Sequence, residues 1–108
     1  VLGHGPHVTR AVEVYKNKFI AYSLGNFCTY GMFTLKGPNG IASLLQLKIN
    51  AQGDFLYADV VSVKQDKINR LTLDKTHAAF QKMKSLTDID FKGHRLKFEN
   101  NRISLNEK

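Results

Sequence analysis

Hydrophobic and polar residues alternate in the middle of the chain. From Ile41 to Ile49 the apolar side chains fall largely on one face, with Gln46 and Lys48 on the other. This period of two predicts a β-strand. Residues 50–54 have turn composition, and 55–63 are rich in β-branched and aromatic residues, so the two stretches form an antiparallel pair. In the second strand, Phe55, Tyr57, Val61 and Val63 lie opposite Leu56, Ala58 and Val60. Because both faces are apolar, this strand is expected inside a sheet that is covered on both sides.

Two hairpins are predicted on either side of this pair. Residues 11–15 and 19–24 have strand composition and flank Lys16-Asn17-Lys18, where asparagine tolerates the left-handed conformation of a tight turn. The second hairpin joins residues 95–98 to 102–105 through Glu99-Asn100-Asn101. Residues 28–40 are rich in glycine and predict a loop, and 68–73 predict a short strand.

One helix is predicted between the strands and the last hairpin. Asp74 can accept hydrogen bonds from the first turn of a helix over about residues 75–86. Its apolar stripe consists of Ala79, Met83 and Leu86, flanked by Phe80. This spacing is typical of an amphipathic helix with one buried face.

These elements together predict an α+β fold. We expect an antiparallel sheet of about four strands over residues 11–63, followed by one helix and a C-terminal β-hairpin. The chain divides into 1–63, the sheet with a histidine loop, and 64–108, the helix and hairpin. Val1-Leu2 reads as the end of a buried strand, so the chain is expected to be a fragment whose exposed apolar sheet surface allows self-association.

Charge adds a preference for anionic partners. The chain has 108 residues and a formal net charge of +7, from 16 basic and 9 acidic residues. Residues 64–108 hold 11 of the basic and six of the acidic residues, so most of the excess lies there. Nucleic acid is not expected as a partner, because neither a helix-turn-helix nor an interleaved aromatic and basic surface is evident. Cys28 is the only cysteine, which excludes an internal disulfide.

The candidate chemistry lies near the start of the chain. His4 and His7 are separated by Gly5 and Pro6, and a tight turn there can hold both imidazoles toward one point as metal ligands. Arg10 follows closely and can pair with an anionic substrate, although a solvated surface arginine is an equal alternative. Asn26 is a further candidate for substrate binding, or a turn residue at a strand end. His77 and His94 are expected to face solvent.

The run Gly3-His4-Gly5-Pro6-His7-Val8, followed by Glu13-Val14-Tyr15-Lys16 and then Ile20–Phe27, resembles the CapA-type proteins of poly-gamma-glutamate capsule biosynthesis. These are related to the calcineurin-like metallophosphoesterases. The resemblance is specific over residues 1 to about 30 and implies the C-terminal part of the family domain, within an α/β sandwich. It also implies a protein of the bacterial cell envelope.

In that superfamily a Gly-His-x-His loop supplies two metal ligands, and earlier Asp-x-His, Gly-Asp and Gly-Asn-His loops supply the rest. None of these earlier motifs occurs in the 108 residues. The family loop commonly reads Gly-x-His-Pro-His-Val, whereas Gly5 stands before the proline here. His7 therefore aligns as a ligand. For the second ligand there are two alternatives: His4 takes its place, or the ligand has been lost.

The resemblance thus implies a divalent metal in the intact protein, acting on an anionic polymer or a phosphorylated substrate. Its partners would include the missing N-terminal half of its own domain. The chain alone is expected to bind no metal tightly and to be inactive, because two imidazoles are too few for a dinuclear catalytic site. The alternative is a non-catalytic basic module that binds a polyanion such as polyglutamate.

Overall fold

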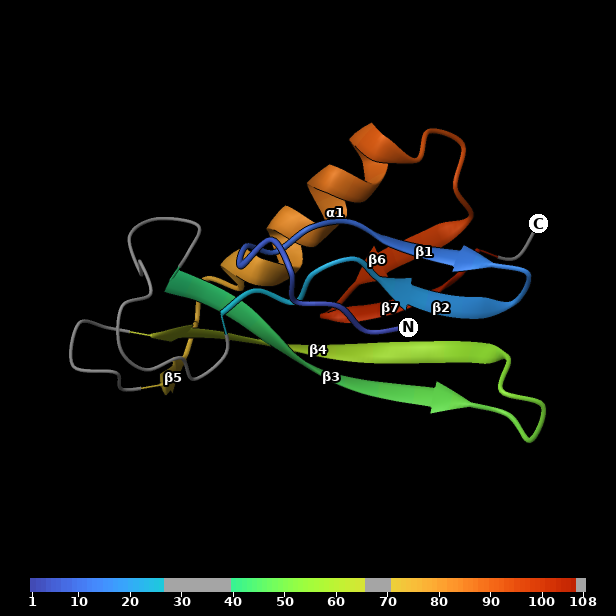
Figure 1. Cartoon of the computed structure of the whole chain (residues 1–108), viewed down its shortest axis with the longest axis horizontal. Coiled ribbons are helices and arrows are strands. Elements are labelled where there is room, and N and C mark those ends of the chain that lie inside the picture. The colour runs from blue at the N-terminus through green and yellow to red at the C-terminus, as the bar shows by residue number, and fades with distance from the viewer. Residues whose placement is uncertain (27–39, 66–70, 107–108) are drawn as a thin grey trace.

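The computed structural model describes residues 1–26, 40–65 and 71–106. Its elements in chain order are β1 (Val12–Tyr15), β2 (Lys18–Ala21), β3 (Ile41–Ile49), β4 (Phe55–Gln65), β5 (Leu71–Leu73), α1 (Ala78–Asp90), β6 (Leu96–Glu99) and β7 (Arg102–Leu105). The helix lies along one side of the strands (Figure 1). The α+β class is confirmed. Cys28 and nearly all of the loop predicted for 28–40 lie outside the described residues.

The strands form two antiparallel sheets instead of one sheet over residues 11–63. β1 pairs only with β2, while the other sheet has the order β3-β4-β7-β6, with β5 also paired to β4. The terminal hairpin can join the second sheet because β4 has 11 residues and offers separate parts of one edge to β5 and β7. A bridge between Gly25 and Ala42 connects the two sheets.

Both predicted hairpins are confirmed, and their turns explain the asparagines. Lys16 and Asn17 have φ angles of 49° and 68°, and Asn100 and Asn101 have 51° and 61°. Two successive residues with positive φ are the signature of a type I′ turn, whose twist matches that of the flanking strands.

The core lies between the helix and one face of β4. Phe80 and Met83 of the helix are buried with Ala58 and Val60 of β4. β4 lies inside its sheet as predicted, but along its opposite face Tyr57, Asp59 and Val61 are only half-buried. β4 was predicted to be covered on both faces. In this stretch only the face with Ala58 and Val60 is fully covered.

The alternation also assigned Phe55 to the wrong face. Opposite Lys48 and Ile49 of β3 stand Tyr57 and Phe55, so β4 has one extra residue at Leu56. Such a β-bulge reverses the facing of the residues beyond it. Phe55 consequently joins the core with Ala58, stacked on Phe19 of β2 with ring centroids 5.2 Å apart, while Leu56 is exposed.

Exposed apolar side chains lie on both faces of the β3–β4 pair. They are Leu44, Leu47, Ile49 and Leu56. Surface of this kind is suited to association with other protein surfaces. Self-association nevertheless stays a prediction.

The helix begins three residues later than predicted, because Asp74 organises a turn before it. His77 N–H donates to the Asp74 carbonyl, and the Asp74 carboxylate accepts from the Thr76 and Ala78 N–H groups at 3.0 and 3.1 Å. Ser62 Oγ of β4 accepts from Phe80 N–H at 3.2 Å. Two first-turn donors that would lack partners inside the helix are thus satisfied from outside it.

The helix reaches Asp90, and its buried residues are Ala79, Phe80, Met83 and Thr87; Leu86 is half-buried. None of the helices in the described ranges is long and apolar enough to cross a membrane.

Replacing Asp74 by alanine is expected to lower the free energy of unfolding by about 1–2 kcal/mol, because the capping acceptor is lost. The pKa of Asp74 lies below its usual value, chiefly because the Thr76 hydroxyl donates to it. Its stabilisation should therefore be complete above about pH 4 and fade as the pH falls through the lowered pKa. Urea unfolding at several pH values checks this, and an equal loss in the variant at pH 2 and pH 7 would contradict it.

Thr87 fastens the helix to β1. Its buried hydroxyl donates to the Met83 carbonyl at 2.7 Å and accepts from the Val12 N–H at 3.1 Å. Thr87→Val keeps the shape of the side chain but leaves the buried Val12 N–H without its acceptor, so we expect the free energy of unfolding to fall by about 1–3 kcal/mol. Thr87→Ser keeps the hydroxyl and should cost less; the reverse order in urea melts would disprove this role.

Candidate metal-ligand turn

The chain forms a tight turn from His4 to His7. His7 N–H donates to the His4 carbonyl at 3.0 Å, and His7 has a φ of 61°. Positive φ is uncommon outside glycine, although histidine is among the residues enriched there. The unfavourable backbone conformation of this turn thus falls on His7, a candidate metal ligand.

Backbone pairing fixes this turn over the segment that follows β2. Gly3 N–H donates to the Ala21 carbonyl at 2.8 Å, and Leu24 N–H donates back to the Gly3 carbonyl at 2.9 Å. Leu2 also pairs in parallel with Ala21. The end of β2 therefore carries the turn, which brings residues about twenty apart in sequence together.

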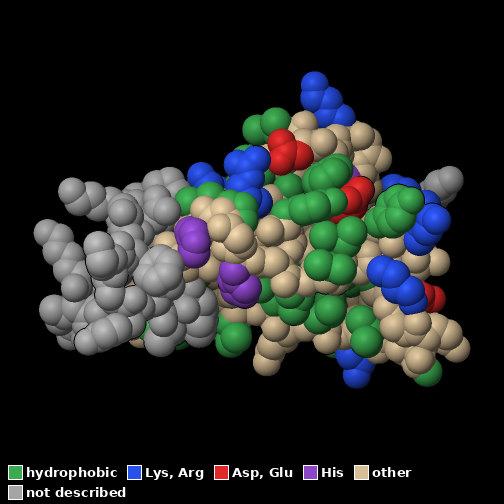
Figure 2. Space-filling model, in the orientation of Figure 1, with side chains coloured by type: hydrophobic (Ala, Val, Ile, Leu, Met, Phe, Trp, Pro, Cys, Tyr) green, Lys and Arg blue, Asp and Glu red, His purple; other side chains and the backbone are tan. Residues whose placement is uncertain are grey.

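Both candidate histidines donate to this segment. His4 Nδ1 lies 3.1 Å from the Gly25 carbonyl oxygen, and His7 Nδ1 lies 2.9 Å from Asn26 Oδ1. Because each partner is an oxygen acceptor, each Nδ1 is positioned to donate, and in a neutral ring the lone pair is then on Nε2. This is the tautomer of a histidine that binds a metal through Nε2 while its other nitrogen is held by a hydrogen bond. Histidine side chains, purple in Figure 2, lie on the surface, and both of these are exposed.

The acceptor segment is firmly packed, unlike the histidines. Gly25 has a φ of 87°, and a Cβ atom there would lie 2.6 Å from the Ile41 carbonyl oxygen. Asn26 is only 3% exposed. The two acceptors are thus held by the junction between the sheets, so they can orient the rings.

Gly5 has no steric reason to be glycine. A Cβ atom there would meet no atom within 4 Å, and Gly5 is absent from the residues with positive φ. The turn that joins His4 to His7 therefore does not depend on glycine at this position.

Arg10 forms an ion pair with the helix and is not a fully solvated arginine. Its Nη2 atom lies 3.4 Å from Asp90 Oδ2 at the end of the helix. Together with Pro6, Tyr22 and Phe91 these residues line a hollow of about 310 Å³ next to the histidine turn. An anion could contact Arg10 there only in competition with Asp90.

Tyr22 is a further residue near the turn that the sequence did not single out. Its ring stacks on Phe91 with centroids 5.7 Å apart, and its hydroxyl donates to Glu13. That hydrogen bond is the main reason why the pKa of Tyr22 is raised. The hairpin register offered a signal, because Glu13 lies opposite Ile20 and thus diagonal to Tyr22.

The other two histidines do not join the turn. His77 is exposed at the start of the helix, as predicted. The prediction for His94 is wrong: its side chain is 17% exposed, and Nε2 donates to Asp88 at 2.7 Å. Within residues 1–26, 40–65 and 71–106, no three side chains of His, Cys, Asp or Glu come together as a metal site.

Comparison with known proteins gives matches to short parts of the chain. Residues 1–30 match the family described as "Bacterial capsule synthesis protein PGA_cap". Two uncharacterized proteins of Sinorhizobium fredii (strain NBRC 101917 / NGR234), y4sH and y4uA, are each 62% identical over 26 residues, or 24% of this chain and 6% of each relative. The matched stretch spans a small fraction of these relatives. No solved structure matches the chain significantly.

Proposed function

We propose that His4 and His7 supply two imidazole ligands, through Nε2, to a divalent metal in a capsule-synthesis protein of the CapA type. One observation carries this proposal: both Nδ1 atoms donate to adjacent residues, Gly25 and Asn26, at 3.1 and 2.9 Å. Ligating histidines are commonly oriented by a hydrogen bond from the ring nitrogen that does not bind the metal, and both rings of this turn have one. The capsule-synthesis match over residues 1–30 includes all four residues.

The donor set fits part of a metal site. Imidazole nitrogens suit Zn²⁺ and related divalent ions, but two of them leave coordination positions that other groups must fill. We place those groups in the remainder of a calcineurin-like metallophosphoesterase domain, at the bacterial cell envelope. A metal bound there would act as a Lewis acid on a phosphorylated or polymeric anionic substrate. The chain alone is proposed to be catalytically inactive.

Within this proposal the chain's own residues position ligands. Asn26 holds the His7 ring in one tautomer and one orientation, so it is a positioning residue. The Gly25 carbonyl does the same for His4. Arg10 is proposed to contact the anionic substrate in the hollow beside the turn, in exchange for its contact with Asp90.

Calorimetric titration of the full chain with Zn²⁺ tests the proposal. The wild-type chain should bind about one ion, and His4→Ala/His7→Ala should weaken binding by about 100-fold or more, because both nitrogen ligands are lost. His77→Ala, which removes an exposed histidine outside the turn, is the matched control and should bind as the wild type does. Equal binding by the double variant and the wild type would refute the site.

A further inference from the structure

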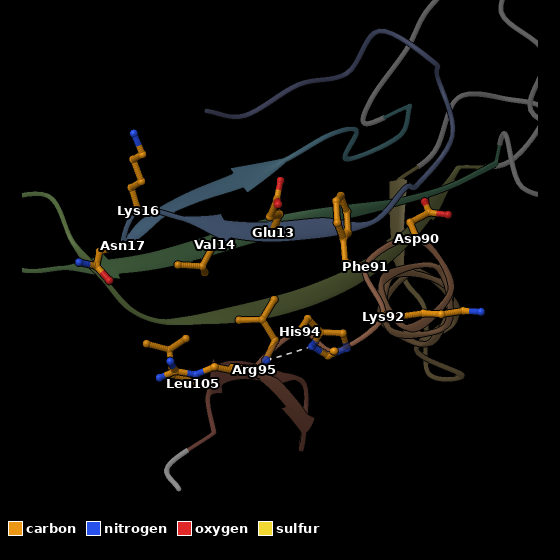
Figure 3. Close-up of a pocket in the computed structure, with 12 residues that line it drawn as sticks. Glu13, Val14, Lys16, Asn17, Asp90, Phe91, Lys92, His94, Arg95 and Leu105 are labelled. Atoms are coloured by element: carbon orange, nitrogen blue, oxygen red, sulfur yellow. Dashed lines mark hydrogen bonds between the residues drawn. The ribbon is translucent and has the colours of Figure 1, made fainter.

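A second cavity lies away from the histidine turn. It has a volume of about 590 Å³ and is bordered by the β1–β2 turn, the end of α1 and the loop leading to β6. Figure 3 shows side chains from all three segments around it. Neither His4 nor His7 lines it, although Asp90 and Phe91 also line the hollow beside Arg10.

Two tight turns form the rim of this cavity and hold its cations. One is the β1–β2 turn, which carries Lys16. The other runs from Phe91 to His94: His94 N–H donates to the Phe91 carbonyl at 3.0 Å, and Gly93 has a φ of 83°. Glycine with positive φ in the third position is typical of a type II turn. This turn carries Lys92 and is followed directly by Arg95.

His94 anchors the second turn. Its Nδ1 accepts from Leu96 N–H at 3.0 Å while its Nε2 donates to Asp88. The dashed line in Figure 3 marks the first of these bonds. Both ring nitrogens are therefore engaged in fixing the loop, which holds the backbone of Lys92 and Arg95 in place, although their side chains are exposed.

The three cations of the rim have no carboxylate within ion-pair distance in the described part of the chain. Every acidic residue described there already has a hydrogen bond or an ion pair. These residues are Glu13, Asp54, Asp59, Asp74, Asp88, Asp90 and Glu99. The excess positive charge of the molecule is thus partly gathered around this cavity, formed by Lys16, Lys92 and Arg95.

The two acids that border the cavity, Glu13 and Asp90, offset these three cations only in part. In Figure 3 the Glu13 carboxylate points to the side of β1 opposite Val14, where Tyr22 donates to it. Asp90 is paired with Arg10. The helix also ends here, but its C-terminal partial charge of about −0.5 is small against three full cations.

We propose that this cavity binds a small multivalent oxyanion, bearing phosphate or carboxylate groups. In Figure 3 the three cations lie apart around the cavity: Lys92 on the right, Arg95 below β1, and Lys16 at the top left, on the same side of β1 as Glu13. Their separation favours a ligand with more than one anionic group. Phe91, Val14 and Leu105 supply an apolar wall for its uncharged body. Arginine and lysine together suit both oxyanion types, and the volume is within the usual range of small-molecule sites.

Titration of the full chain with inorganic pyrophosphate and, separately, with citrate tests the proposal by calorimetry and amide NMR. Lys16→Gln/Arg95→Gln should weaken the tighter of the two probes by about tenfold or more, since about 1.4 kcal/mol is lost. The control Lys48→Gln/Lys75→Gln removes the same charge from residues that do not line the cavity. It should change the affinity by less than about twofold.

Tighter binding of pyrophosphate assigns a phosphorylated ligand, and tighter binding of citrate assigns a carboxylated one. In either case the amide signals of Gly93 and Asn17 should shift on binding. Absence of saturable binding by both probes would overturn the proposal. So would equal weakening by the two double variants, because that would show general attraction to a basic surface. Neither result depends on metal, so failure here leaves the histidine proposal intact.

Discussion

Replacing Gly25 by alanine is expected to destabilise the chain by about 3 kcal/mol or more, the largest effect of any single substitution predicted here. Two costs combine. The φ of 87° is unfavourable for any residue with a Cβ atom, and that atom would lie 2.6 Å from the backbone oxygen of Ile41. Backbone cannot move aside as a flexible side chain can, so the junction between the two sheets must open. Urea unfolding measures the loss.

Substitutions at two other glycines distinguish the cost of the positive φ from the cost of the steric contact. Gly93 has a φ of 83° but open space around it, so Gly93→Ala should show the conformational cost alone, about 1 kcal/mol. Gly5 has neither constraint, and Gly5→Ala should stay within about 0.5 kcal/mol of the wild type. A Gly25→Ala variant no less stable than Gly93→Ala would show that the contact with Ile41 is unimportant.

Replacing Asn26 by leucine is expected to weaken Zn²⁺ binding by about 10- to 100-fold without removing a ligand. Leucine has a similar size but cannot accept the His7 Nδ1–H, so the ring loses both its orientation and the preference for the tautomer with the lone pair on Nε2. Calorimetric titration measures the affinity, and the amide spectrum of the variant establishes that the fold is retained.

Asn26→Asp is the matched variant, because it keeps an oxygen acceptor at the same position. It should bind Zn²⁺ at least as tightly as the wild type, since a carboxylate partner raises the basicity of a ligating histidine. If both variants lose affinity equally, the hydrogen bond to His7 is not the reason for the loss.

Local pattern was sufficient for most elements of this fold. The alternation over Ile41–Ile49, the asparagines of the two hairpin turns and Asp74 before the helix each act within a few residues. The structure has the strand and both hairpins as predicted, and the helix three residues later. The partition into two sheets was not predictable in this way. It depends on β7 pairing with β4, more than 40 residues earlier in the chain.

The errors have physical causes. The bulge at Leu56 reverses the facing of Phe55, and nothing in a period-two pattern reveals a bulge in advance. His94 appeared to be a loop residue, but Asp88 six positions earlier lies on the last turns of the helix, which a prediction ending at residue 86 excluded.

The residues of the candidate site could be predicted from the sequence, but their arrangement in space could not. His4, His7, Asn26 and Arg10 were identified from the sequence. The hydrogen bonds that bring the first three together span 19 to 21 residues and depend on the pairing of Gly3 with the end of β2. Arg10 was expected near a substrate, and its contact with Asp90 arises from a residue 80 positions later.

The most direct test of the account is the imidazole ¹⁵N NMR spectrum of the full chain during Zn²⁺ titration. We predict that the Nε2 signals of His4 and His7 shift together, while their Nδ1 atoms remain protonated and the ring signals of His77 and His94 stay unchanged. If the His4 and His7 signals do not shift, or shift no more than that of His77, the two histidines are not a pair of metal ligands.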